Sequence, residues 1–266
     1  MKVVVCTKQT PSTTAVLIVD DGGNVSWNDP GGKPNIVNPW DEYTIEEGIR
    51  LKENHGATDV IALTLGTEES RDALKTALAM GCTEATLVSD ESFAGSDTLG
   101  TARILAAAIN QIGDVQIALF GKQAIDGDTG ITPVQTARKL GWTPLTFVSD
   151  IKEISDGQIT VERLLDDGKE TVTASLPVVI SVVKEINEPR YPSFMGIRKA
   201  NRATIPTLTA SDISVDGSTV AEASQVDWGH IYSLPAREGS VEIIEADSIE
   251  EKAAILAEKL FEEKVI

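Results

Sequence analysis

The most constraining feature of this sequence is an alternation between short, largely apolar runs and longer segments in which apolar residues recur every three or four positions. A short run bounded by polar residues is typical of a strand buried on both faces, and the longer pattern is typical of a helix. Such apolar runs lie at 3–6, 59–65, 85–88 and 115–120. Because strands that alternate with helices form parallel sheets covered on both faces, we predict a doubly wound α/β fold.

Helical patterns fill the intervals between these runs. One helix begins at Asn38 and turns Ile45 and Ile49 towards the sheet, a second ends at Gly81, and a third covers about residues 99–112. In open sheets of this kind, ligands bind beyond the carboxyl ends of the strands, where the strand order reverses. We therefore expect any ligand near the residues that follow these strands.

The second half of the chain has a different rhythm. Beyond residue 143 come β-type runs at 145–148, 159–165, 170–174 and 178–183, joined by Asp-Gly turn signals, which predict an antiparallel extension. Residues 187–206 have little periodicity and predict a long surface loop. The last segment has Ser248 three residues before a glutamate, a capping-box pattern that predicts a helix able to dock on its own domain or on a partner.

Composition excludes several classes of function. The 23 Lys and Arg residues against 41 Asp and Glu residues give a net charge of −18, which disfavours binding to nucleic acid or to an anionic membrane. The apolar run at the N-terminus is too short for a signal peptide, and no stretch approaches the roughly 18 apolar residues of a membrane span. The two cysteines, Cys6 and Cys82, have no metal-site spacing and fit a reducing compartment. We expect a soluble, cytoplasmic protein without membrane insertion or bound metal.

The segment 121–133 is the best candidate for a binding loop. It follows a buried strand, contains several glycines and hydroxyl groups, and leads into a helix, so its backbone N–H groups could hold a phosphate. A flexible connection with Asp-Gly turns is the alternative. The loop has neither GxGxxG nor GxxxxGK[ST], and Gly130 and Ala137 stand where a calcium loop needs oxygen ligands.

Catalytic side chains are scarce. His55 and His230 are the only histidines, and no Ser-His-Asp or Cys-His arrangement is evident. This scarcity favours a cofactor carrier, since a bound cofactor can supply the chemistry while the protein positions it. A basic stretch between Arg190 and Arg202 surrounds the apolar tip 192–195, which favours docking to a partner over an ordinary solvated loop.

Taken together, the chain resembles the β subunit of electron transfer flavoproteins along almost its whole length. The motifs that carry the resemblance occur in the family's order at 38–41, 76–81, 121–126, 161–177 and 187–191. The resemblance implies a Rossmann-like, adenine-nucleotide-α-hydrolase-like fold and a heterodimer in which an α subunit holds an electron-transferring FAD. It also implies a β subunit that binds AMP or, in bifurcating members, a second FAD.

The family's nucleotide site, carried over by position, would place the adenine near Cys6 and Leu65, and the ribose and phosphates near residues 126–132. The residues it implies are Cys6, Asn38, Pro39, Trp40, Asp41, Leu65, Gly66, Gln123, Ala124, Ile125, Asp126, Gly127, Asp128, Thr129, Gly130, Ile131, Thr132, Pro133 and Val134. The run Lys8-Gln9-Thr10-Pro11 and the pair Trp40-Asp41 look more like the FAD-binding, bifurcating branch. FAD is therefore the favoured cofactor and AMP the alternative.

The resemblance also implies partners. The family's recognition loop, here within 187–200, would use Arg190, Tyr191, Pro192, Ser193, Phe194 and Met195 to dock on an acyl-CoA dehydrogenase. Residues 1–205 would form the nucleotide-binding domain, and 206–266 an arm and helix that pack on the α subunit. In the bifurcating case NADH would reduce the flavin, and a ferredoxin or flavodoxin would accept one electron. A nucleotide-binding regulatory protein without a redox role is the alternative from another class.

Overall fold

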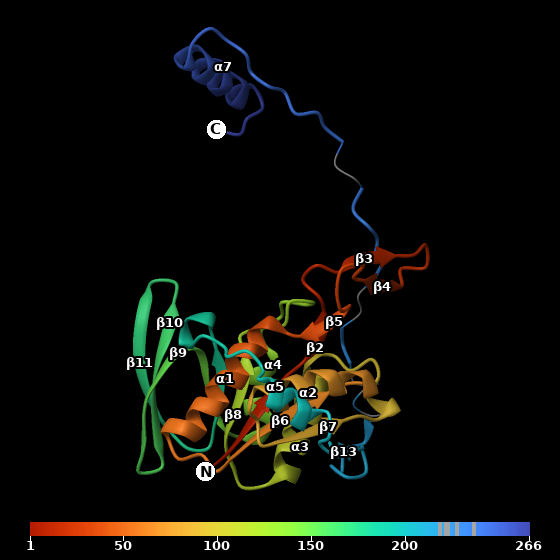
Figure 1. The fold of residues 1–266 in the computed structure, drawn as a ribbon, viewed down its shortest axis with the longest axis vertical. Coiled ribbons are helices and arrows are strands. Elements are labelled where there is room, and N and C mark those ends of the chain that lie inside the picture. The colour runs from red at the N-terminus through yellow and green to blue at the C-terminus, as the bar shows by residue number, and fades with distance from the viewer. Residues whose placement is uncertain (218–219, 221–223, 227–228, 236–237) are drawn as a thin grey trace.

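A nine-stranded sheet forms the centre of the body in the computed structural model, which describes residues 1–217, 220, 224–226, 229–235 and 238–266 (Figure 1). Its strand order is β11-β10-β9-β12-β8-β1-β6-β7-β13. The strands are β1 (Lys2–Cys6), β6 (Asp59–Leu65), β7 (Glu84–Val88), β8 (Val115–Gly121), β9 (Thr143–Ser155), β10 (Gln158–Leu165), β11 (Gly168–Ser175), β12 (Val178–Val182) and β13 (Thr207–Leu208).

Helices cover both faces of this sheet, as the alternation of patterns predicts. The covering helices are α1 (Pro39–Asn54), α2 (Arg71–Met80), α3 (Thr98–Ile112) and α4 (Thr132–Leu140). The other described helices are α5 (Phe194–Ala200) and α7 (Ile249–Glu262), with short 3-10 turns η1 (Glu68–Ser70), η2 (Glu91–Phe93) and η3 (Lys184–Ile186). Val3 and Val5 of β1 belong to the core under α1 and α2, while Val4 and Cys6 belong to the core under α3 and α4. This alternation along one strand confirms the doubly wound fold.

The strand order reverses beside β1. From β1 the chain passes through α1 to β6 and through α2 to β7, and it then returns through α3 to β8 on the other side of β1. All of these neighbouring strands are parallel. The carboxyl ends of β1 and β8 therefore frame the crevice in which such a fold binds ligands.

The antiparallel extension is confirmed for β9, β10 and β11, but one part of that prediction is wrong. The sequence predicts residues 178–183 as part of the extension, whereas β12 runs parallel to both β8 and the first part of β9. All five residues of β12 are buried, because helices cover this part of the sheet on both faces. A continuous apolar run of this kind is the pattern of an interior parallel strand.

Two segments contain more structure than their sequences predict. The polar stretch before α1 forms the hairpin β3 (Val16–Val19) and β4 (Val25–Asn28) and the small pair β2 (Gln9–Pro11) and β5 (Asn35–Val37). The predicted loop 187–206 includes α5, whose N-terminus is capped because the Ser193 hydroxyl accepts a hydrogen bond from the Gly196 N–H. Seven residues are too few for helical periodicity to be recognised.

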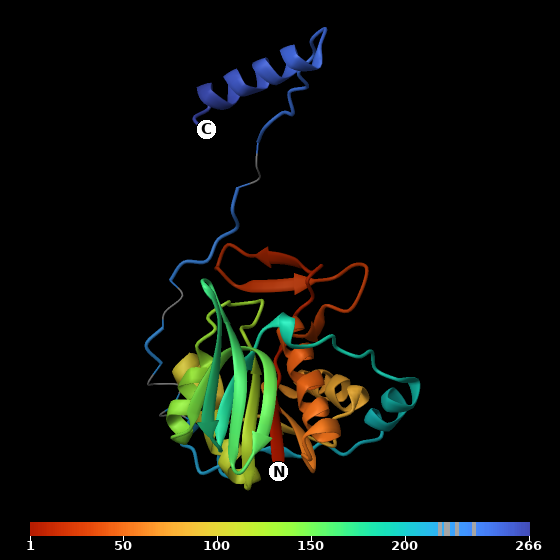
Figure 2. The same ribbon diagram turned by 90° about the vertical axis from the view of Figure 1, so that its left-hand side faces the viewer.

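The C-terminal part leaves the body gradually. Strand β13 pairs with β7, and Ile213 is buried in the core under α3. Helix α7 lies apart from the body (Figure 2). The Ser248 hydroxyl accepts a hydrogen bond from the Glu251 N–H, which confirms the predicted cap of this helix. Part of the predicted arm 206–266 lies outside the described residues. Among the described helices, none is long and apolar enough to cross a membrane.

Candidate functional site

Asn38 joins the start of α1 to the loop that follows β8. Its side chain is almost fully buried, with 1% of the residue exposed. Its amide nitrogen donates to Asp41 Oδ1 and to the Gln123 carbonyl, both at 2.9 Å, and its amide oxygen accepts from the Ile125 N–H at 3.2 Å. Segments about 85 positions apart in the chain are thus fixed together by a single side chain at the reversal point.

Asp41 connects the same place to the end of β1. Its Oδ2 accepts a hydrogen bond from the Lys8 N–H at 2.7 Å. Burial raises the pKa of Asp41 to about 7, although hydrogen bonds from Asn38 and from the backbone of Lys8 and Gly121 favour the charged form. A Cβ on Gly121 would lie 2.5 Å from Asp41 Oδ1 and 2.8 Å from Trp40 Cβ, so this close approach of β8 and α1 requires glycine.

The loop between β8 and α4 is folded on itself and is open to solvent. The N–H groups of Gly127 and Asp128 both donate to the Ala124 carbonyl, and the Gln123 amide donates to Asp128 Oδ1 at 2.7 Å. Asp128 and Gly130 have positive φ values of 50° and 62°. Residues 126–131 are exposed.

This loop and the start of α4 have the properties that an anion site needs. No side chain caps α4, and a proline follows its first residue, Thr132. Unpaired N–H groups in the first turn of a helix attract phosphate or carboxylate groups. A Cβ on Gly127 would have no atom within 4 Å, so space for a ligand exists above the loop. This segment therefore has the chemistry to accept a phosphate or another anionic group.

Lys8 also belongs to this site, although the sequence names it only within the run Lys8-Gln9-Thr10-Pro11 and not as a binding residue. Its ammonium group forms an ion pair with the Asp126 carboxylate, at 2.6 and 2.9 Å from the two oxygens. The pair spans the crevice from the end of β1 to the loop after β8. The sequence feature that points to Lys8 as a binding residue is its position, two residues after the end of a predicted strand.

Cys6, Leu65 and Gly66 lie at the ends of the two adjoining strands, β1 and β6. Cys6 is buried, and both that burial and the charge of Asp41 raise the pKa of its thiol. Gly66 donates its N–H to the Val88 carbonyl and lies against the side chain of Ser70. The structure thus ties Asn38 and Asp41 to the loop after β8, while Leu65 and Gly66 stand one strand further along the same edge.

A hollow of about 530 Å³ opens on the other side of Trp40. Lys122 lies between two aromatic rings there, with its nitrogen 5.5 Å from the ring centre of Trp40 and 5.7 Å from that of Phe147. Phe147 has a positive φ of 57° within β9. A strand residue in this conformation leaves the regular pleat, and no sequence pattern predicts it. The hollow offers aromatic faces and a cation at the carboxyl edge of the sheet.

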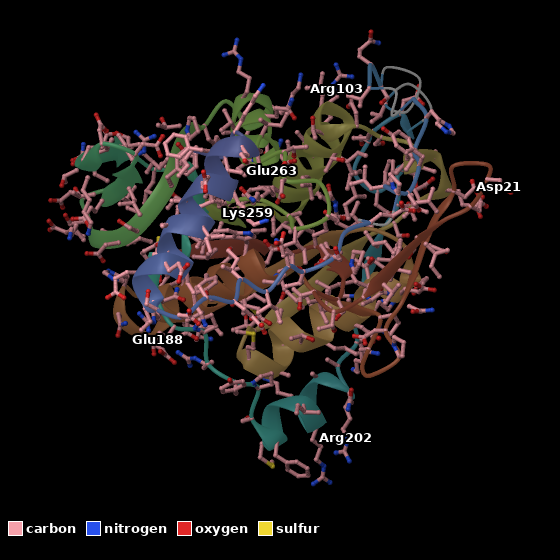
Figure 3. All side chains as sticks on the ribbon, turned by 90° about the horizontal axis from the view of Figure 1, so that it is seen from above. Asp21, Arg103, Glu188, Arg202, Lys259 and Glu263 are labelled. Atoms are coloured by element: carbon pink, nitrogen blue, oxygen red, sulfur yellow. The ribbon has the colours of Figure 1, made fainter. Side chains whose placement is uncertain are left out.

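The predicted docking residues divide into two groups. Tyr191, Phe194 and Met195 are 94%, 81% and 68% exposed, so they form an apolar tip in solvent. The Arg190 side chain instead forms ion pairs with carboxylates of α1. Figure 3 shows α5 protruding at one edge of the molecule, with Arg202 close after its C-terminal end.

Among the described residues, no group of three or more His, Cys, Asp or Glu side chains could hold a metal ion. The side chains in the crevice are amide, carboxylate and ammonium groups that hold the loops together. Groups of this kind suit the binding and orientation of a ligand, and those named above include no nucleophile paired with a base.

Comparison with known proteins places these observations in a family. A family model described as electron transfer flavoprotein domain matches residues 29–213. The caffeyl-CoA reductase-Etf complex subunit CarD of Acetobacterium woodii is 37% identical, with all of both chains covered. The electron transfer flavoprotein subunit beta of Megasphaera elsdenii is 35% identical, again with all of both chains covered. The corresponding subunit of Mycobacterium tuberculosis is 34% identical over 84% of each chain.

Proposed function

Since the chain belongs to the electron transfer flavoprotein family and matches β subunits of that family from end to end, we propose that it is the β subunit of a heterodimer and binds FAD in the crevice between β1 and β8. The observation that carries the proposal is the junction of Asn38, Asp41 and the loop after β8. This junction holds an open, glycine-containing loop and an uncapped helix start beside a reversal of strand order.

The protein's own residues bind and orient the nucleotide. Backbone N–H groups of 123–134 hold the phosphates, which explains how a chain of net charge −18 binds an anion. Lys8, which forms an ion pair with Asp126, supplies a local positive charge at the rim. The ends of β1 and β6, around Cys6 and Leu65, enclose the adenine.

The bound FAD would supply the redox chemistry, which is uptake of two electrons from NADH and their release one at a time. In the bifurcating case a ferredoxin or flavodoxin would accept one of these electrons, and an acyl-CoA dehydrogenase would receive the other by way of the FAD held by the α subunit. The similarity to a subunit of a caffeyl-CoA reductase-Etf complex supports this proposal, because that name joins an electron transfer flavoprotein to a reductase of a CoA thioester.

The remaining surfaces serve the partners. The exposed apolar tip of residues 191–195 docks on the dehydrogenase, with the basic residues of α5 around it. The arm within 206–266 and helix α7 pack on the α subunit. This role is supported by the exposure of Ile249, Leu256 and Phe261, since a helix so apolar is stable when another surface covers it.

A non-bifurcating β subunit with AMP in the same crevice is the second candidate, because the loop after β8 fits the adenosine phosphate portion that both nucleotides share. The test is to purify the αβ heterodimer, denature it, and count FAD and AMP per dimer. Two FAD and no AMP support the proposal, and one FAD with one AMP establishes the second candidate. A colourless chain that stays monomeric with the α subunit present would instead indicate a regulatory nucleotide-binding protein.

A further inference from the structure

The side chain of Arg190 is held by two carboxylates of α1. Its Nε lies 2.7 Å from Glu46 Oε2, and its Nη2 lies 3.0 Å from Glu46 Oε1. Its Nη1 and Nη2 contact the two oxygens of Glu53 at 2.8 and 2.9 Å. The Arg190 N–H also donates to Glu46 Oε2, at 3.2 Å. Both carboxylates are therefore bound bidentately, the geometry that a guanidinium group holds best. We call this arrangement the clasp.

The clasp differs from an ordinary surface ion pair because one of its carboxylates is buried. The Glu46 side chain is 4% exposed, whereas that of Glu53 is 50% exposed. Burial alone would raise the pKa of Glu46, but hydrogen bonds from Arg190 and Arg50 hold it below its usual value. A buried carboxylate that loses such a partner is strongly destabilised, so the chain has a physical reason to keep Arg190 in place.

Two further contacts fix the segment on either side of the apolar tip. Before the tip, the Asn187 amide donates to the Tyr43 carbonyl and to Glu47 Oε2, each at 3.0 Å, and both partners belong to α1. After the tip, a Cβ on Gly196 would lie 2.2 Å from the Ala79 carbonyl, so α5 is in direct backbone contact with the end of α2. The segment 191–195, with its exposed Tyr191, Phe194 and Met195, is thus held at both ends.

Helix α1 connects this anchorage to the crevice. Its N-terminal end carries Asp41 and follows Asn38, the junction of the nucleotide site. Glu46 lies eight residues after Asn38, which corresponds to about 12 Å along a helix axis. A single rigid element therefore bears both the site junction and the carboxylates that hold the docking segment.

From this arrangement we infer that Arg190 is a positioning residue: the clasp of Arg190 with Glu46 and Glu53 holds the apolar tip 191–195 at a fixed place relative to the nucleotide crevice. This inference rests on the proposed function, in which electrons from the nucleotide of that crevice reach a docked dehydrogenase by way of the α subunit, so the tip decides where the dehydrogenase lies on the heterodimer. Electron transfer slows steeply as donor and acceptor move apart, so a fixed tip sets both the affinity for the partner and the rate of transfer within the complex.

The test compares heterodimers that carry Arg190→Lys, Glu53→Gln or the matched control Arg103→Lys. A lysine keeps the charge of Arg190 but cannot bind two carboxylates bidentately. Arg103 lies on α3, at the opposite edge of the molecule from α5 (Figure 3). Glu53→Gln weakens the exposed half of the clasp and leaves the buried carboxylate paired, so this variant folds even if Arg190→Lys does not.

Hydrogen exchange of residues 187–200 measures the ordering itself. We expect faster exchange there in Arg190→Lys and, to a smaller extent, in Glu53→Gln, with unchanged exchange at 121–134 and in the control. With acyl-CoA dehydrogenase as the acceptor, we expect the KM for the dehydrogenase to rise about tenfold, as expected from about 1.4 kcal/mol of lost preorganisation. We also expect the rate at saturating dehydrogenase to fall.

A variant that is merely less stable would show a lower unfolding midpoint with unchanged KM and saturating rate, and this result would overturn the inference. Unchanged exchange at 187–200 in both variants would overturn it as well. If the wild-type heterodimer passes no electrons to the dehydrogenase, the proposed function fails. Faster exchange at 187–200 in Arg190→Lys would still support the clasp in that case.

Discussion

Replacing Asn38 by alanine is the sharpest perturbation of the site, because this side chain makes three hydrogen bonds while 1% exposed. The variant leaves the Gln123 carbonyl and the Ile125 N–H without that partner and deprives the Asp41 carboxylate of a donor. A buried polar group left unsatisfied costs about 1–3 kcal/mol. We therefore expect a loss of about 4 kcal/mol in the free energy of unfolding, a large share of the stability of an ordinary domain.

The loss should depend on pH. The hydrogen bond from Asn38 lowers the pKa of Asp41, which means that it stabilises the charged carboxylate. Without that bond the pKa of Asp41 rises further above 7, so the alanine variant should be more destabilised at pH 8 than at pH 5.5. The carboxyl group carries a proton at the lower pH and needs the donor less.

The assay is urea unfolding of the heterodimer at both pH values, followed by circular dichroism, with nucleotide content measured on the same samples. Asn28→Ala, on the exposed strand β4, is the matched control. We expect a lower midpoint and reduced nucleotide content for Asn38→Ala alone. An unchanged midpoint, or equal destabilisation at the two pH values, would refute the reasoning that Asn38 holds a buried, charged Asp41.

Three further predictions follow from the same contacts. Burial raises the pKa of Asp41 to about 7 in the folded chain, against 3.8 in the unfolded chain. The free energy of unfolding should therefore fall by about 4 kcal/mol between pH 4 and pH 7 and then level off. The urea midpoint of an Asp41→Asn variant should change less with pH over this range. Gly121→Ala should lower the free energy of unfolding by about 1–3 kcal/mol and reduce the nucleotide content, because the new Cβ would overlap Asp41. In the control Gly127→Ala the new Cβ has no atom within 4 Å, so this variant should keep the wild-type unfolding midpoint. Replacing Phe194 and Met195 by alanine should weaken transfer to the dehydrogenase and leave flavin content unchanged, and an unaltered transfer rate would reject the docking role.

Sequence reasoning located the sheet well because its strands are buried. Residues 3–6 are buried on both faces of the sheet, and a continuous apolar run is the pattern that predicts such burial. The same reasoning misplaced 178–183, because an apolar run reports burial but does not report the direction of pairing. Strand β12 lies between β8 and β9 in the sheet, and this position depends on pairing with strands that are distant in the sequence.

The sequence predicts the region of the candidate site, but it does not predict the contacts that hold the site together. The glycines and hydroxyl groups of 121–133 predict a binding loop, and the resemblance to the family adds Asn38 and Asp41 to the expected site. That Asn38 and Asp41 serve as structural links between loops depends on contacts across more than 30 positions in the chain. The same holds for Arg190, which sequence grouped with the docking tip and the structure pairs with Glu46, 144 positions away.

The central claim is that backbone N–H groups at the carboxyl edge of the sheet hold an adenine nucleotide. The most direct test is hydrogen exchange of the heterodimer, stripped of nucleotide and then reloaded with FAD or AMP. The account predicts slower exchange within 121–134 and at 7–10 when the nucleotide binds. Unchanged exchange in both segments, while nucleotide remains bound to the β subunit, would place the nucleotide elsewhere and contradict the account.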